Sequence, residues 1–263
     1  RLILYFTLPC LTFVKLQQDA PPEGMGALWG TFLVATASMF ACGWLAHLLF
    51  RRETPRRRAV LIHICMFANC GFMGYPLAAA ALAAENMLYV VMYVASFTLL
   101  TWTAGVYLYA GKEGLSLKRA LMNPTLGAVL LGLVFFGLSL RIPAIPLSAM
   151  ALLGETTIPL SMIVVGGRLL GLSPSHLKDR SMMLACLLRL IVFPVGIWFL
   201  LGLLPMPLGA REAVLVCAAM PGAAITAIQA EHFGGDALLG ARSVAVSTVF
   251  SLVTIPLVLL LLG

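Results

Sequence analysis

The chain has 263 residues, of which 61% are hydrophobic and 10% are charged, and its mean hydropathy is +1.02. A water-soluble domain carries about 25% charged residues. The composition therefore excludes an ordinary soluble protein and predicts that lipid surrounds most of the chain. The net charge of +7 does not indicate nucleic acid, because membrane proteins concentrate basic residues in their cytoplasmic loops.

Nine apolar segments predict an all-α polytopic membrane protein, because the apolar runs are continuous and lack the alternation of a β-barrel strand. The predicted transmembrane spans are Leu2–Leu16, Ala27–Phe50, Ala59–Leu82, Met87–Ala110, Asn123–Leu140, Ser148–Leu170, Met182–Leu204, Ala213–Ala230 and Ala237–Leu262.

Nine is an odd number, and the chain opens on Arg1 with a short span. We therefore expect one further helix before it, which makes ten helices in two five-helix inverted repeats. The first repeat covers residues 1–110 and the second covers residues 123–263, with a cytoplasmic linker at residues 111–122. A weak internal match supports the repeat, since Pro9 precedes Gly71 by 62 residues and Pro159 precedes Pro221 by the same 62.

The loops alternate in charge. Thirteen Lys and Arg residues fall in one set of loops, which includes Arg51–Arg58, and three fall in the other set. Because cytoplasmic loops are enriched in basic residues, the Arg51–Arg58 loop is expected in the cytoplasm and the C-terminus outside. The expected location is the inner (plasma) membrane.

The third predicted span contains Gly71, Gly74 and Pro76 within six residues at its centre. Glycine weakens a helix, and proline removes a backbone hydrogen bond and clashes with the preceding turn. We therefore expect a broken helix near the middle of the membrane, where the second half-helix directs a positive dipole end into a cavity. Asn69 adds an amide that can donate and accept hydrogen bonds there.

The eighth predicted span repeats this arrangement with Pro221-Gly222, followed by Thr226 and Gln229. Each break alone is explained by a packing kink, but two interrupted helices in corresponding halves indicate the binding site of a transporter. The candidate substrate-binding residues are Asn69, Gly71, Gly74, Tyr75, Pro76, Pro221, Gly222, Thr226 and Gln229.

Ionisable residues inside spans are costly and suggest function. Glu155 lies about seven residues into the sixth span and is a candidate for proton or cation coupling, with a wet vestibule as the alternative. For Arg189 in the seventh span, snorkelling to the cytoplasmic interface is favoured over a contact with substrate. His63 is interpreted as an interfacial residue.

The stretch NCGFMGYPL and the runs AAMPGAAITAIQAEHFGGD and STVFSLVTIPL resemble the signatures of the auxin efflux carrier family. The resemblance implies a fold related to bile acid sodium symporters, with a scaffold domain, a transport domain and broken helices that cross at Gly71–Pro76 and Pro221–Gly222. The family's asparagine corresponds to Asn69 and its crossover prolines to Pro76 and Pro221. Such carriers move organic anions, which include auxin and dicarboxylates such as malate or malonate.

The predicted function is therefore secondary transport of a small organic anion by alternating access, and not catalysis. An anion channel or a membrane sensor is the alternative, and an intramembrane enzyme is disfavoured because no catalytic constellation is evident. No cofactor and no metal site are expected, since the six cysteines lie inside apolar runs without ligand spacing. Membrane lipids are expected partners, whereas coupling to protons or sodium and assembly into a homodimer are left open.

Overall fold

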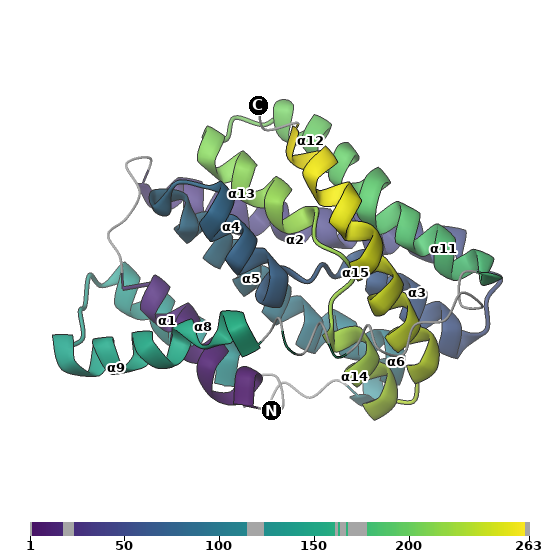
Figure 1. The fold of residues 1–263 in the computed structure, drawn as a ribbon, viewed down its shortest axis with the longest axis horizontal. Helices are drawn as coiled ribbons and strands as arrows, with labels where there is room; N and C mark the ends of the chain where they lie inside the picture. Colours follow the sequence, from purple (N-terminus) through teal and green to yellow (C-terminus); the bar gives the residue numbers. More distant parts are fainter. Residues whose placement is uncertain are drawn as a thin grey trace.

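The computed structural model describes residues 2–17, 24–114, 124–160 and 178–260, together with Ile163 and Gly167. Every regular element in these stretches is a helix, as the sequence predicted (Figure 1). The elements are η1 (Ile3–Thr7), α1 (Leu8–Lys15), α2 (Gly24–Leu49), α3 (Pro55–Met66), η2 (Cys70–Gly74), α4 (Tyr75–Ala81), η3 (Ala84–Asn86), α5 (Met87–Leu100), η4 (Thr101–Gly105), α6 (Val106–Gly114), α8 (Pro124–Gly137), α9 (Ala144–Glu155), α11 (Arg180–Leu187), η6 (Leu188–Val192), α12 (Phe193–Gly202), α13 (Leu208–Ala218), α14 (Ile225–His232) and α15 (Ala237–Leu259). The η elements are single π-helical turns, except the 3₁₀ turn η3.

Four helices of the described chain are long and apolar enough to cross a membrane, namely Gly24–Leu49, Ala84–Lys112, Arg180–Gly202 and Ala237–Leu259. They coincide with the second, fourth, seventh and ninth predicted spans. The third and eighth spans are each divided into two short helices, which explains why neither is among the four. The sixth predicted span, Ser148–Leu170, runs beyond the described residues.

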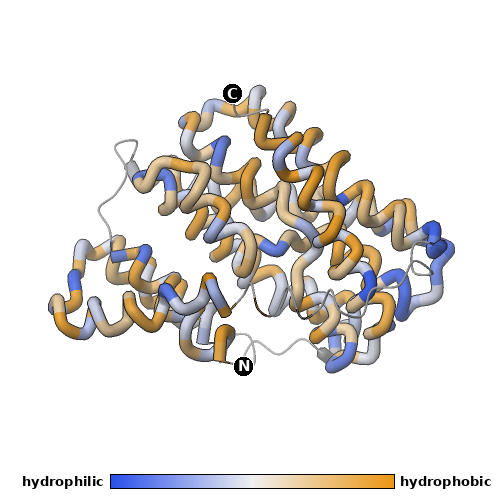
Figure 2. Tube along the Cα trace, in the orientation of Figure 1, coloured by the Kyte–Doolittle hydropathy of each residue, from blue (hydrophilic) through white to orange (hydrophobic). Residues whose placement is uncertain are grey.

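Large apolar side chains cover the outside of the molecule. Trp44 is 67% exposed, Phe199 is 71% exposed and Leu252 is 70% exposed. Soluble monomers rarely display so continuous an apolar surface, whereas lipid is a favourable solvent for it. In Figure 2 the hydrophilic segments gather toward helix ends, most clearly where α3 and α11 begin.

The helices form two groups (Figure 1). The smaller group contains η1, α1, α8 and α9, and the larger group is built around α2, α3, α5, α11, α13 and α15. The groups meet mainly where α5 contacts α8 and α1. Within the smaller group, Gly154 lets α9 approach α1 closely, since a Cβ at this position would lie 2.8 Å from the Leu11 backbone.

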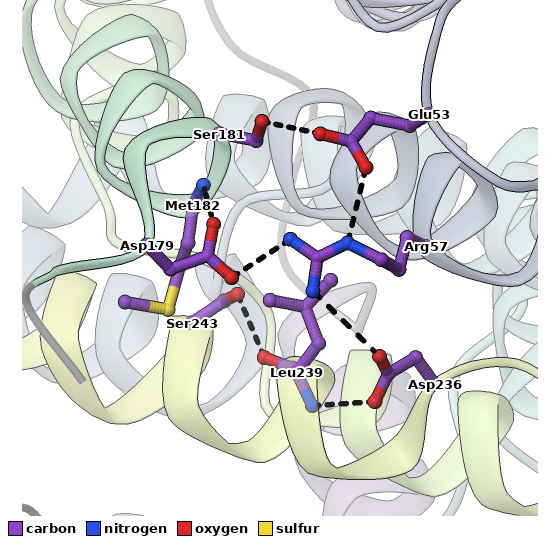
Figure 3. A network of polar contacts seen from close by, with 8 residues as sticks. All are labelled: Glu53, Arg57, Asp179, Ser181, Met182, Asp236, Leu239 and Ser243. Atoms are coloured by element: carbon purple, nitrogen blue, oxygen red, sulfur yellow. Dashed lines mark hydrogen bonds and ion pairs between the residues drawn. The ribbon is translucent and has the colours of Figure 1, made fainter. Parts of the chain in front are cut away.

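One end of the larger group is held by a network centred on Arg57, which is drawn in Figure 3. Its guanidinium lies 3.0 Å from the Glu53 carboxylate, 2.7 Å from the Asp179 carboxylate and 3.9 Å from the Asp236 carboxylate. Asp179 and Asp236 also cap α11 and α15, because each accepts a backbone N–H in the first turn of its helix. One arginine thus ties together the beginnings of α3, α11 and α15.

The opposite end carries a different set of polar contacts. The Asn86 amide donates to the Glu212 carboxylate at 3.4 Å, and the Ile142 N–H donates to the Gln17 side chain at 3.2 Å. Each of these two contacts joins a pair of loops that the charge pattern assigned to the same side.

Candidate functional site

The first interruption is an extended segment between α3 and η2. Helix α3 ends at Met66, and the backbone is extended at Phe67, with φ −112° and ψ 113°, before helical turns resume at Cys70. We call Phe67–Asn69 the first break. The sequence predicted the interruption at Gly71–Pro76, and this position is wrong by several residues.

The reason for the shift is the π-helical turn η2. In this wider turn the Tyr75 N–H donates to the Cys70 carbonyl oxygen five residues back. Pro76 follows in the first turn of α4, where a missing N–H costs little. The residues with the strongest helix-breaking tendency are therefore accommodated inside the second half-helix.

The second interruption lies where the sequence predicted it. Helix α13 ends at Ala218 and α14 begins at Ile225, so that Pro221-Gly222 falls in the non-helical stretch between them. We call Ala219–Ala224 the second break.

The two breaks contact each other as a short antiparallel pair. The Asn69 N–H donates to the Pro221 carbonyl oxygen at 2.7 Å, and the Ala223 N–H donates to the Phe67 carbonyl oxygen at 3.0 Å. Backbone groups that leave a helix inside a membrane need partners in the protein. Each break supplies such partners to the other, and this contact is called the crossing below.

A third element, α15, completes the crossing. The Gly222 N–H donates to the Ser247 hydroxyl at 3.2 Å, and this hydroxyl donates in turn to the Val244 carbonyl oxygen of its own helix. Ser247 is fully buried. Ser247 of α15 therefore faces the crossing, a contact that was not predicted from the sequence.

Asn69 lies at the centre of the crossing as the residue before η2. Its side chain is 4% exposed, and its Nδ2 has no hydrogen-bond partner among the described residues. The helix Cys70–Ala81 begins beside it, and α14 begins just beyond the second break. Two helix N-termini, each a positive dipole end, thus lie near an unused amide donor.

Thr226 and Gln229 are buried in α14, where both hydrogen-bond to His63 of α3. The His63 Nδ1 lies 2.9 Å from the Thr226 hydroxyl, and Nε2 lies 2.9 Å from the Gln229 Oε1. Gln229 also donates through Nε2 to the Thr101 carbonyl oxygen at 3.0 Å. Because an amide oxygen is an acceptor, His63 carries its proton on Nε2 and accepts the Thr226 proton on Nδ1.

This arrangement corrects the interpretation of His63. The side chain is fully buried, and its ring packs against Phe67 and Tyr109 with centroids 4.5 and 5.4 Å away. His63 is thus an interior link between α3 and α14 and not an interfacial residue. The polar groups of Thr226 and Gln229 are occupied by protein partners in this conformation.

Arg189 is also placed differently from the sequence interpretation. Its side chain is 1% exposed, and its guanidinium donates to the carbonyl oxygens of Cys65 and Ala218. These residues lie at the ends of α3 and α13, immediately before the breaks. Arg189 therefore does not snorkel to an interface but points to the interior beside the crossing.

The remaining predicted residues lie on other faces. Gly71 is buried in η2, and Gly74 packs toward Cys217 and Met220. Pro76 lines an apolar groove with α15. Tyr75 instead lines a cavity of about 530 Å³ between the two helix groups.

Lys15 and Glu155 line this same cavity, from α1 and from the last residue of α9. Glu155 is exposed and lies away from the crossing, so the structure does not unite it with Asn69. No group of three or more metal-ligating side chains occurs within the described ranges.

The rule that intramembrane ionisable groups suggest function would have selected His63 and Arg189 from the sequence. The sequence could not predict the partners of these two residues, because they are far away along the chain. Thr226 and Gln229 are 163 and 166 residues from His63, and Cys65 is 124 residues from Arg189.

A profile of the membrane transport protein family matches residues 1–118 and 113–259. The chain belongs to this family, the auxin efflux carriers. The resemblance drawn from the two break motifs is thereby confirmed.

An uncharacterized transporter of Methanocaldococcus jannaschii is 28% identical over 98% of this chain and 86% of its own length. An uncharacterized transporter of Methanothermobacter thermautotrophicus is 28% identical with the same coverage of both chains. This auxin efflux carrier family member is therefore similar to transporters along nearly all of its length.

Proposed function

We propose that the protein is a secondary transporter that carries a small organic anion across a membrane by alternating access, with the crossing as its binding site. A mono- or dicarboxylate such as malate, malonate or an auxin-like acid fits this proposal. The observation that carries it is the unpartnered Asn69 Nδ2, buried where two half-helices begin.

The chemistry of the crossing favours an anion. Helix N-termini present N–H groups and a partial positive charge of about half an elementary charge each. The Asn69 amide is a further donor in the same place, and the guanidinium of Arg189 adds a full positive charge nearby. A carboxylate could accept hydrogen bonds from the helix N-termini and from the Asn69 amide, and the nearby positive charge of Arg189 favours its negative charge.

The two helix groups support alternating access. The cavity between them is lined by Lys15 of the smaller group and by Tyr75 of the larger group. Tyr75 follows Asn69 by six residues, which is about 9 Å along a helix. A relative movement of the groups would open this route on one side of the crossing and close it on the other.

The full topology is part of the same proposal. In this topology the third and eighth spans, each broken in the middle, belong to the two inverted repeats, and their breaks meet at the crossing. Helix α2 is 26 residues long and reaches about 39 Å, so that its two ends lie on opposite sides of a bilayer. The end that holds Arg51–Arg58 faces the cytoplasm of the inner (plasma) membrane under the positive-inside rule, and the C-terminus lies outside.

The proposed site of the coupling ion is the cavity between the helix groups and not the crossing. Glu155 shares the cavity with Lys15 and is the carboxylate in its described lining. We propose that Glu155 binds a coupling proton when the cavity is open, and that Asn69 binds the substrate.

Reconstitution of the full chain in liposomes tests the proposal. Uptake of radiolabelled malate, malonate and indole-3-acetate is measured with and without a proton gradient, for the wild type and for Asn69→Ala. Saturable uptake that is lost in a folded Asn69→Ala variant supports a carrier with its site at the crossing. Rapid flux that does not saturate would indicate an anion channel instead, and uptake unaffected by Asn69→Ala would contradict the site.

A further inference from the structure

Arg189 is a buried cation without a buried counter-charge. It lies in the π-helical turn η6 and has the largest side chain among the fully buried residues of the described chain. None of the ion pairs within the described ranges includes it. Burial of an isolated charge costs several kcal/mol unless other groups compensate it, so the surroundings of Arg189 must supply that compensation.

The compensation comes from two helix C-termini. The guanidinium Nη1 donates to the Cys65 carbonyl oxygen at 3.0 Å, and Nη2 donates to the Ala218 carbonyl oxygen. Cys65 lies in the last turn of α3 and Ala218 is the last residue of α13. The final carbonyls of a helix have no partner within it and together carry about half a negative charge.

The carbonyl oxygens of Cys65 and Ala218 thus form a cation site, which in this chain is filled by a side chain. We infer that Arg189 acts as a tethered cation that joins the ends of α3 and α13 and thereby positions the two breaks. It is a positioning residue, because no contact with substrate is required of it. The inference deepens the proposed function. Only its transport test rests on that function, because the test of stability requires no substrate.

The chain also contains a matched control. Arg211 likewise donates to two backbone carbonyl oxygens, those of Met206 and Leu204, at 2.9 Å each. Arg211 is partly exposed, however, and water can replace its hydrogen bonds when the side chain is removed. Arg189→Ala and Arg211→Ala therefore remove similar contacts in a buried and a wet environment.

The experiment compares thermal unfolding of the purified full chain in detergent, with low millimolar guanidinium chloride or with equal concentrations of NaCl or KCl. Arg189→Ala is expected to lower Tm by about 5–10 °C, since two buried carbonyls lose their partner. Free guanidinium should occupy the vacated site and restore part of this loss. The wild type and Arg211→Ala should not respond to guanidinium.

Two results would overturn the inference. One is an Arg189→Ala protein as stable as Arg211→Ala, and the other is a recovery that NaCl or KCl produces equally well. If Arg189→Ala does not fold, Arg189→Lys and Arg189→Met replace it. Lys keeps the cation and should unfold at a higher temperature than Met, and equal losses in these two variants would exclude a role for the charge.

Transport provides the second readout. The rate of anion uptake in liposomes is expected to be more than tenfold lower for Arg189→Ala than for the wild type. Guanidinium should restore part of this rate. If the wild type takes up none of the acids, the proposed function fails. The thermal comparison still decides the role of Arg189 in that case, because it requires no substrate.

Discussion

Gly222 of the second break packs directly against Ile64 of α3. A Cβ at Gly222 would lie 2.2 Å from the Ile64 Cγ1 and 2.5 Å from its Cδ1, which is closer than non-bonded atoms approach. Both residues are buried, and Gly222 is also paired with Ala68 through the backbone. The glycine is therefore required by close approach, because its φ is not in the left-handed region.

The first prediction follows from this contact. Gly222→Ala should separate α3 from the second break and destabilise the protein by about 3 kcal/mol, as overpacked core substitutions do. Thermal unfolding in detergent measures the effect. Gly127→Ala is the control, since a Cβ at Gly127 of α8 meets no atom within 4 Å.

A second substitution makes this prediction specific. Ile64→Ala in the Gly222→Ala background removes the side chain that the new methyl group would meet. The double variant should be more stable than the sum of the two single losses, which is the signature of coupled neighbours. Strict additivity would mean that the Gly222–Ile64 contact does not set the separation of the helices.

The second prediction concerns His63. His63→Ala leaves the Thr226 hydroxyl and the Gln229 amide oxygen without their buried partner and should cost about 3 kcal/mol. His47→Ala, at the exposed end of α2, should change stability by less than about 0.5 kcal/mol. The two Tm values measured side by side test the assignment, and equal values would return His63 to an interfacial role.

The sequence predicted the continuous helices well, because a long apolar run such as that of α2 or α15 has few alternatives in lipid. It also predicted the second break, since Pro221 cannot continue a helical hydrogen-bond pattern. The first break was displaced because the π-turn before Tyr75 absorbs Pro76, and local sequence does not distinguish such a turn from a break. Contacts between distant segments, such as those of Arg189, were beyond prediction from local pattern alone.

The same limit applies to the candidate site. Asn69 was predicted from its amide beside the expected break and from its match to the family's asparagine, and the structure shows its buried Nδ2 without a described partner. Thr226 and Gln229 were chosen for their polarity, yet their hydrogen bonds are directed to His63. Polar residues in the middle of a predicted span correctly indicated buried polar groups. They did not distinguish side chains that are free to bind a ligand from side chains that hydrogen-bond to another helix.

The third prediction concerns the network of Figure 3. Burial raises the pKa of Asp179, but hydrogen bonds from Arg57 and from the Met182 N–H lower it more, so that the net pKa lies below the usual value. A lowered carboxyl pKa stabilises the folded state above the unfolded pKa of about 3.9, and this contribution is lost as the pH falls through the folded value.

Asp179→Asn tests this sign. Asparagine is also a good N-cap, so the substitution removes the charge and preserves the helix cap. We expect a lower Tm for Asp179→Asn than for the wild type at pH 7, and a difference that shrinks as the pH falls below about 4. Glu85→Gln, at the exposed residue before Asn86, should leave the pH dependence unchanged. A constant difference between wild type and Asp179→Asn across this range would exclude the ion pair as its cause.

The fourth prediction concerns the cavity between the helix groups, where Lys15 and Glu155 carry opposite charges. Lys15→Gln should raise KM for anion uptake about fivefold, equivalent to about 1 kcal/mol, with little change in kcat. Glu155→Gln should lower KM for a dicarboxylate, because it removes repulsion, and should abolish any dependence on the proton gradient. Both shifts in KM should weaken at high salt, since exposed charges are screened.

Lys112→Gln in the exposed part of α6, at the other end of the molecule, is the control. If Lys15→Gln and Lys112→Gln have the same KM as the wild type, the cavity is not the route by which the anion reaches the crossing.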